Sequence, residues 1–138
     1  MVSKSEHRQR SSCPVALGLD LIGDHWSLLI VRDLLFFQRH EYRDIQRGEE
    51  AISSNILTDR LNKLRTAGIV KSIPHPESQR RKLYYLTPKG KDLIHVLIAI
   101  SEWSQQHEGL TTALPEPLEQ AQKKGRTAFI NKVFYLLS

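Results

Sequence analysis

The chain has 138 residues, of which 40% are hydrophobic and 25% are charged, and this balance is typical of a single globular domain. Its 20 Lys and Arg against 15 Asp and Glu give a net charge of +5, which favours a polyanionic partner, although a modest basic excess is also common on solvated surfaces. No apolar run approaches the roughly 20 residues that cross a bilayer, and the polar start lacks the apolar middle of a signal peptide, so we expect a cytoplasmic protein without a membrane segment.

Two helices, the first of them short, are expected near the N-terminus, after a flexible polar arm over residues 1–12. Pro14 suits the first turn of a helix that ends at Gly23 and whose apolar side is formed by Val15, Leu17, Leu21 and Ile22. Asp24 then caps a second helix over residues 25–37. That helix has too many large apolar residues for a narrow stripe, which predicts the central core helix: Trp26, Leu29, Ile30, Val31, Leu34 and Leu35.

The next two helices form a predicted helix-turn-helix, because a short helix over residues 41–46 is joined by a tight loop to a helix over residues 53–66. Ser53 caps the second helix, since its hydroxyl can accept from the free N–H groups of the first turn. Its buried stripe is formed by Leu57, Leu61 and Leu64. Its outer face then carries short polar and charged groups that can reach DNA: Ser54, Asn55, Thr58, Asp59, Asn62 and Lys63.

A two-stranded ribbon follows. Gly68 ends the helix in the left-handed conformation, and residues 69–73 begin the first strand. Two prolines cannot donate to a sheet, so they place residues 75–79 at the hairpin tip, and residues 82–86 return as the second strand. The end of this ribbon is polar and basic, with His75, Gln79, Arg80, Arg81 and Lys82.

A polar helix face followed by a basic ribbon is typical of a winged helix that reads duplex DNA. In most isolated helices of this kind the polar outer face is simply in contact with solvent. Here the adjacent basic ribbon makes DNA binding the better explanation. Helix-turn-helix proteins contact base edges mainly from the N-terminal part of the second helix. We therefore expect Ser54, Asn55 and Thr58 to contact bases, and Asn62 and Lys63 to contact the DNA backbone.

Within the ribbon, Arg80 and Arg81 are the first candidates for phosphate or minor-groove contacts, and His75 and Gln79 are secondary.

Enzymatic functions have little support in the sequence. The six histidines lack the spacing of metal ligands, and there is neither a Gly-rich phosphate loop nor a Gly-x-Ser-x-Gly turn. The single cysteine also excludes a cysteine-based zinc cluster. We predict no catalysis, no metal and no cofactor.

A long helix is expected over residues 88–107, with Thr87 as its cap and Pro88 in its first turn. Its apolar residues extend far around the cylinder, and the tail from residue 109 ends in a second apolar stretch that would favour aggregation if it stayed exposed. We therefore predict that this helix and the tail pack across a twofold homodimer through Leu93, Leu97, Ile100, Trp103, Phe129, Val133 and Phe134.

Four segments resemble the HxlR-type winged helix-turn-helix transcriptional regulators: Cys13-Pro14-Val15, residues 20–30, Ile52-Ser53 with residues 57–61, and residues 85–90. The resemblance extends from about Cys13 to Trp103, and it is specific because the motifs occur in the family order and spacing. It implies a dimeric bacterial or archaeal DNA-binding regulator, with a recognition helix at about 53–66 and a wing at about 74–82.

Cys13 has two possible roles. A free cysteine is often a small buried hydrophobe, whereas one at a helix N-terminus can have a lowered pKa and a reactive thiolate. Some members of the family that the chain resembles sense oxidants or electrophiles through the matching cysteine, which adds the hypothesis that oxidation or alkylation of Cys13 alters DNA affinity. Without a second cysteine, Cys13 could form only a bridge to its dimer mate, a mixed disulfide or an adduct.

The chain departs from the family pattern at three positions. Phe37 stands where a glycine usually follows the core helix. Glu41 stands where a basic residue usually precedes the aromatic of the short helix, so it has the wrong charge for a phosphate contact there. Ala51 replaces the glycine that commonly precedes Ile52, so this turn must reach its geometry without glycine.

The sequence thus predicts an α+β, mostly helical fold: a winged helix-turn-helix domain over residues 13–108 with a two-stranded wing, and a C-terminal helical extension over residues 109–138, with terminal helices used for dimerisation. Such a homodimer would regulate transcription by binding a pseudo-palindromic operator in double-stranded DNA, with half-sites about one helical turn or a multiple apart. The sequence specifies no small-molecule effector. The alternative is a winged helix that contacts protein or RNA without operator binding, which would show shallow salt dependence and no sequence discrimination.

Overall fold

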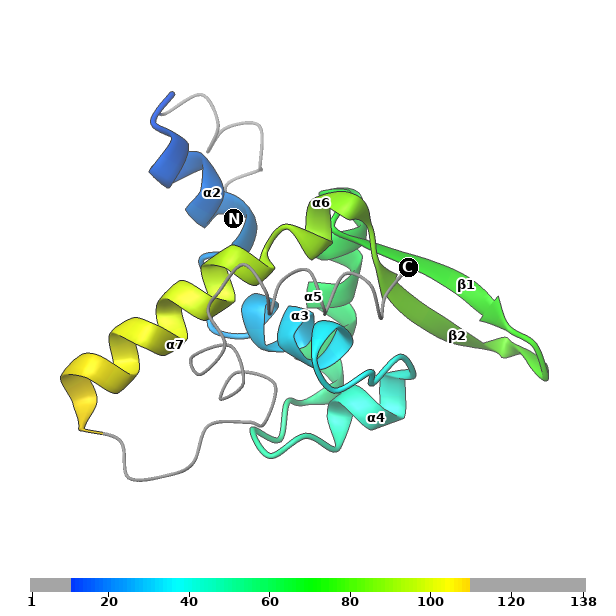
Figure 1. The fold of residues 1–138 in the computed structure, drawn as a ribbon. Helices are drawn as coiled ribbons and strands as arrows, with labels where there is room; N and C mark the ends of the chain where they lie inside the picture. Colours follow the sequence, from blue (N-terminus) through cyan, green and yellow to red (C-terminus); the bar gives the residue numbers. More distant parts are fainter. Residues whose placement is uncertain (1–10, 110–138) are drawn as a thin grey trace.

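In the computed structural model, which describes residues 11–109, a cluster of helices is followed by an antiparallel hairpin that projects from it (Figure 1). The mostly helical fold with a two-stranded wing is therefore confirmed. The elements in chain order are α2 (Pro14–Ile22), α3 (Ser27–Leu35), α4 (Tyr42–Gln46), α5 (Ser54–Thr66), β1 (Val70–His75), β2 (Ser78–Leu86), α6 (Pro88–Lys91) and α7 (Ile94–Glu108).

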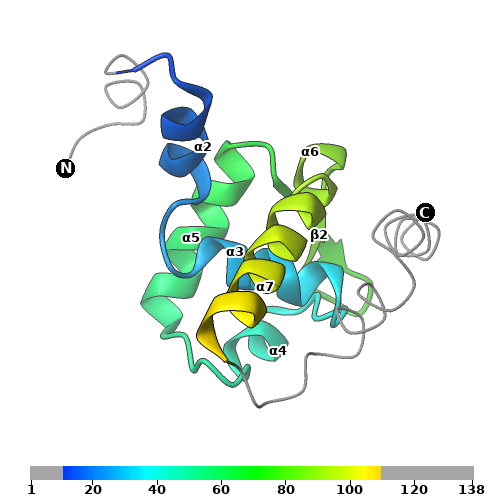
Figure 2. The ribbon, with the colours of Figure 1, turned by 60° about the vertical axis from the view of Figure 1, so that its left-hand side comes forward.

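The core forms around α3, as the density of apolar residues on this helix predicts. Buried side chains of α3 meet the leucine stripe of α5 and two isoleucines of α7, and Figure 2 shows α7 lying across α3. Each buried Leu or Ile contributes about 1.5–3 kcal/mol relative to exposure. The main members of this core are Ile30, Val31, Leu34, Ile45, Leu57, Leu61, Leu64, Ile94 and Ile98.

The helix α3 is shorter than the predicted span of residues 25–37, and its two ends show why. Asp24 accepts hydrogen bonds from the backbone N–H of Trp26 and of Ser27, both at 3.0 Å, so it caps the turn from which the helix starts. At the other end Gln38 has a left-handed backbone, with φ of 51°, which stops the helix from continuing.

The first helix, α2, differs from expectation in its packing. Gly23 follows it as predicted, and glycine is needed there because a Cβ would lie 2.4 Å from the carbonyl oxygen of Leu19. None of its residues is buried, however, and the predicted apolar residue Val15 is exposed. Figure 1 shows α2 projecting from the cluster of the other helices, so it contributes little to the core of its own chain.

The predicted single helix over residues 88–107 is two helices, which corrects the sequence-based expectation. Thr87 caps the first one as predicted, because its Oγ1 accepts from the backbone N–H of Gly90 at 3.1 Å. Gly90 also approaches the carbonyl oxygen of Ile69 so closely that a Cβ would lie 2.2 Å from it. This close contact holds α6 against the end of the wing. The turn that follows is tighter than a turn of α-helix, because the backbone N–H of Leu93 donates to the carbonyl oxygen of Gly90, three residues earlier.

The hairpin tip is also shorter than predicted. The strands continue to His75 and from Ser78, so the tip is the Pro76-Glu77 turn and not residues 75–79. The register shifts between Pro74 and His75, which leaves Gln79, Arg80 and Arg81 without direct partners on β1. These residues therefore lie in β2 behind the tip, where Gln79 and Arg80 are exposed and Arg81 is partly buried.

A short bridge ties the helix-turn-helix to the wing. The backbone N–H of Tyr84 donates to His40 O at 2.8 Å, and Glu41 pairs with Leu83 in an isolated antiparallel bridge. The chain just before α4 thus lies beside β2.

Within residues 11–109 no single helix is long and apolar enough to span a bilayer, and α2 and α3 reach that length and composition only as a pair bent by 76°.

Ala51 has a left-handed backbone, with φ of 55°, in the turn before α5. A left-handed backbone costs an L-residue about 1–2 kcal/mol, and glycine avoids this cost but has more entropy to lose on folding. We expect Ala51→Gly to raise the free energy of unfolding by about 0.5–1 kcal/mol, measured by urea denaturation. The matched control is Ala99→Gly on the exposed side of α7, which should lower it by about the same amount. Loss of stability in both variants would contradict this account of the turn.

Candidate nucleic-acid interface

The helix α5 presents a polar face to solvent because its leucine stripe is held by the core. Ser53 caps the helix as predicted, accepting from the backbone N–H of Ile56 at 3.3 Å. Five of the six predicted recognition residues are exposed, and the side chain of Lys63 is 41% exposed. Ser54 and Asn55 lie in the first turn, where they are open to an approaching ligand.

Tyr42 fixes the position of α4 against this helix. Its hydroxyl donates to the backbone oxygen of Ser54 at 2.8 Å and lies 2.9 Å from Oγ1 of Thr58. The Thr58 hydroxyl is therefore already engaged in a hydrogen bond. Of the three predicted base-contacting residues, Ser54 and Asn55 are the more available ones.

Charged residues in the middle of α5 form ion pairs with one another and with Asp24. Arg60 donates to Asp24 at 2.8 Å and also binds Asp59, while Lys63 lies 3.3 Å from the same Asp59 carboxylate. Desolvation opposes ionisation of Asp24, but hydrogen bonds from Ser27 and Arg60 outweigh it and lower its pKa. These pairs join α5 to the turn before α3, and they partly neutralise Lys63.

The wing residues fall into two groups. Gln79, Arg80 and Lys82 are exposed, as a contact role requires. Arg81 and His75 instead turn toward the start of α4, where both contact the Glu41 carboxylate.

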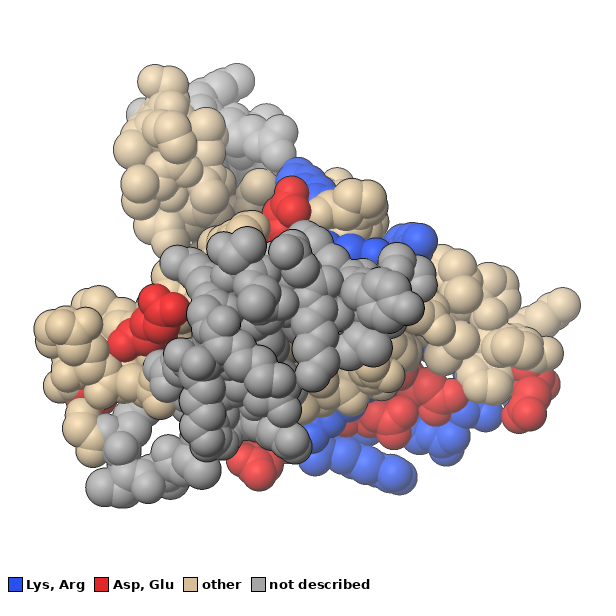
Figure 3. All heavy atoms as spheres, viewed as in Figure 1, with Lys and Arg blue, Asp and Glu red and all other residues tan. Residues whose placement is uncertain are grey.

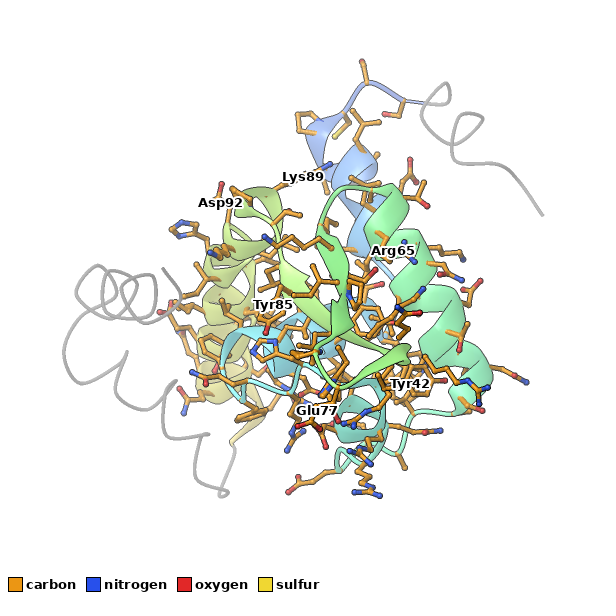
Figure 4. All side chains as sticks on the ribbon, turned by 90° about the vertical axis from the view of Figure 1, so that its right-hand side faces the viewer. Tyr42, Arg65, Glu77, Tyr85, Lys89 and Asp92 are labelled. Atoms are coloured by element: carbon orange, nitrogen blue, oxygen red, sulfur yellow. The ribbon has the colours of Figure 1, made fainter. Side chains whose placement is uncertain are left out.

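A groove of about 450 Å³ separates the wing from α4. It is lined by Glu41, Tyr42, Arg43, Arg80, Arg81, Lys82 and Tyr84. Figure 3 shows basic side chains interleaved with acidic ones along the edge of the molecule where α4 and the wing lie. In Figure 4, Tyr42 and Arg65 lie to one side of the hairpin and Tyr85 to the other. Burial raises the pKa of the Tyr84 hydroxyl in this groove, although Arg65 opposes the shift.

A charge cluster that the sequence did not reveal supports the loop before α5. Arg32 of α3 forms two hydrogen bonds with Glu50, at 2.8 and 2.9 Å, and binds the buried Asp33 at 2.8 Å. Arg39 lies 3.4 Å from the same Asp33 oxygen. The Arg32 hydrogen bonds lower the pKa of Glu50 to about 2, whereas burial raises that of Asp33. This cluster ties the loop that leads into α5 to the central helix.

Cys13 and the predicted dimer residues lie away from this face. Cys13 is exposed just before α2, and hydrogen bonds from the backbone N–H groups of Ala16 and Val15 lower the pKa of its thiol. Leu93 and Leu97 are half-buried against the core of their own chain, whereas Ile100 and Trp103 are exposed on α7. The other three predicted residues lie outside the described part of the chain: Phe129, Val133 and Phe134.

Metal binding was not expected from the sequence. Across residues 11–109 no cluster of three or more His, Cys, Asp and Glu side chains is arranged to hold an ion.

The comparisons with known proteins agree with this geometry. A family model described as HxlR-like helix-turn-helix matches residues 21–111. The uncharacterized HTH-type transcriptional regulator sll1512 of Synechocystis sp. is 36% identical over 100 residues, which are 68% of this chain and 72% of that protein. The crystal structure of PA1607 matches with a TM-score of 0.68 at 36% identity, covering 78% of this chain and 74% of that one. The redox regulator HypR in its oxidized form matches with a TM-score of 0.58 at 27% identity, covering 69% and 97%.

The Arg32 and Glu50 pair predicts an acid sensitivity. Because folding lowers the pKa of Glu50 from 4.5 to about 2, its stabilisation is fully present above pH 4.5 and is lost as the pH falls toward 2. We expect Glu50→Gln to be less stable than the wild type at neutral pH and to lose less stability between pH 4.5 and 2. Asp33 acts in the opposite sense, because its raised pKa favours folding at low pH, and it is present in both proteins.

The measurement is thermal unfolding followed by circular dichroism across this pH range. Glu49→Gln is the matched control, since it removes the same charge from the neighbouring residue and leaves the Arg32 pair intact. Parallel pH profiles for the wild type and Glu50→Gln would refute the role assigned to Glu50.

Proposed function

Because this chain belongs to the HxlR-like helix-turn-helix family, whose members are DNA-binding transcriptional regulators, we propose that it binds a specific duplex site as a homodimer and regulates transcription by occupying or leaving that site. The observation that carries this proposal is the combination of the exposed first turn of α5 with the cationic groove between α4 and the wing. A helix of this size fits the major groove of B-DNA, and a neighbouring basic wing can then reach the phosphates beside it.

The roles of individual residues follow from what each side chain already contacts. Ser54 and Asn55 supply base contacts, because they lie in the first turn and point away from the core. Thr58 reaches the DNA only if its bond to Tyr42 is shared or broken. Arg80 and Lys82 supply phosphate contacts from the exposed side of the wing.

A second copy of the chain would cover the apolar surface that remains. Five large hydrophobic side chains in residues 11–109 are exposed, and four of them lie on α2 and α7: Val15, Leu19, Ile100 and Trp103. Because α2 also has no fully buried residue in its own chain, these two helices form the proposed dimer interface. A twofold dimer of this kind requires an inverted repeat in the operator.

Cys13 is the residue through which we propose that a chemical signal acts on DNA binding. Its thiol is exposed and its lowered pKa increases the thiolate fraction that reacts with oxidants or electrophiles. The similarity to a protein described as a redox regulator is consistent with such a role. We propose that oxidation or alkylation of Cys13 changes DNA affinity through the position of α2.

The test of DNA binding is selection of bound duplexes from a random library at near-physiological salt, followed by sequencing. We expect an inverted repeat. Asn55→Ala should then weaken binding to that operator by about 1–3 kcal/mol and leave random duplex unaffected, because a base contact carries sequence information.

The matched control is Asn62→Ala, which makes the same chemical change farther along α5 and should weaken both duplexes alike. Capture of a protein or RNA without duplex enrichment would instead support the alternative use of the fold.

Dimerisation can be tested at Trp103, whose side chain is 59% exposed on α7. We expect Trp103→Glu to shift the protein to a monomer, because a carboxylate at an apolar interface is costly to desolvate. Light scattering after size-exclusion chromatography measures the mass. Ile73→Glu is the control, since Ile73 is a 43% exposed apolar residue of the wing and should leave the dimer intact. A dimer that persists in Trp103→Glu would place the interface elsewhere.

The role of Cys13 can be tested by treating the wild type and Cys13→Ser with diamide or N-ethylmaleimide before measuring operator binding. We expect the wild type to change its affinity and Cys13→Ser to stay unchanged, because the serine hydroxyl remains protonated. Mass spectrometry identifies the product as a bridge between two Cys13 residues, a mixed disulfide or an adduct. Identical behaviour of both proteins would remove Cys13 from the mechanism.

A further inference from the structure

The carboxylate of Glu41 occupies the inner wall of the groove between α4 and the wing. Arg43 Nε donates to its Oε2 at 3.1 Å, and His75 Nε2 lies 3.0 Å from its Oε1. Arg81 binds the same Oε1. The side chain is only 17% exposed, so its oxygens are surrounded mainly by basic groups. One carboxylate thus receives three basic side chains from two separate parts of the chain.

The backbone holds Glu41 in this position. Its bridge to Leu83 and the neighbouring bond from Tyr84 N–H to His40 O anchor the residue beside β2. Desolvation opposes ionisation of the carboxyl, but Arg43 and Arg81 outweigh it and keep its pKa below the usual range. At neutral pH a fixed negative charge therefore stands among the groove's cationic side chains.

A guanidinium group binds carboxylate and phosphate in the same way, through parallel N–H donors. A DNA phosphate that enters the groove must therefore compete with Glu41 for Arg81, and it is also repelled by the carboxylate. We propose that Glu41 is an internal competitor of the DNA phosphate, which withholds Arg81 from the DNA and limits sequence-independent affinity. This inference rests on the proposed DNA binding. Because every sequence carries phosphates, the effect is expected on random duplex.

The experiment measures binding of a fluorescently labelled random duplex by anisotropy over a range of NaCl concentrations, using the full chain. Glu41→Gln removes the charge and keeps the size and the backbone bridge. We expect it to bind about tenfold more tightly than the wild type at low salt, since one charge-assisted contact is added. The slope of log affinity against log salt should steepen by about one unit, for one additional neutralised phosphate.

Two controls separate competition from a general change in charge. Glu77→Gln at the wing tip removes the same charge from an exposed side chain and should have a much smaller effect. Arg81→Ala should abolish the gain in the Glu41→Gln background, because the guanidinium that Glu41→Gln releases is then absent. An equal gain from Glu77→Gln, or a full gain without Arg81, would overturn the proposal.

The other outcomes of the binding experiment also distinguish this inference from the proposed function. Circular dichroism reports whether each variant folds, and Glu41→Asp, which keeps the charge but has a shorter reach, provides a second variant with a smaller expected gain. Wild-type binding without a gain in either folded variant overturns this inference alone. Failure of the wild type and Glu41→Gln to bind any duplex overturns the proposed function, and this inference with it.

Discussion

The burial of the α5 leucine stripe in the core around α3 is the constraint on which the rest of the structure depends. Leu57, Leu61 and Leu64 are buried in the core, so the opposite face of the helix must point to solvent. That orientation exposes Asn55 in the first turn, and it leaves the wing beside the end of the same helix. A rotation of α5 about its axis would bury polar groups and expose leucines together. The hydrophobic core therefore sets the orientation of the interface as well as the stability of the fold.

Several basic groups in and behind the interface lie beside a carboxylate. Arg60 and Lys63 share Asp59, Arg32 binds Glu50, and Arg81 binds Glu41. The number of basic residues, 20 Lys and Arg, consequently overstates the positive potential that DNA would meet. Sequence-independent binding depends almost entirely on such potential, whereas operator binding also draws on base contacts. Acidic residues within the interface thus lower affinity for random DNA while they hold its elements in place.

Local signals in the sequence predicted most of the fold, and long-range contacts account for what it missed. Each of the two caps, Ser53 and Thr87, acts through hydrogen bonds within its own first turn, so it is visible in a short window of sequence. The break near Leu93 depends on Gly90 meeting Ile69, which periodicity cannot show. The same distinction between local and long-range contacts holds for the proposed interface. The outer face of α5 could be predicted from the spacing of its leucines. The pairing of Glu41 with a residue 40 positions away could not.

Three consecutive residues connect the two parts of the proposed interface. His40 bonds to the Tyr84 backbone, Glu41 binds the wing, and Tyr42 bonds to α5. The wing and α5 therefore share one short segment as a common support, and the position of each depends on it. A displacement of this segment would move base-contacting and phosphate-contacting groups together. Glu41 thus lies where a single side chain can affect both the orientation of the wing and the charge of the groove.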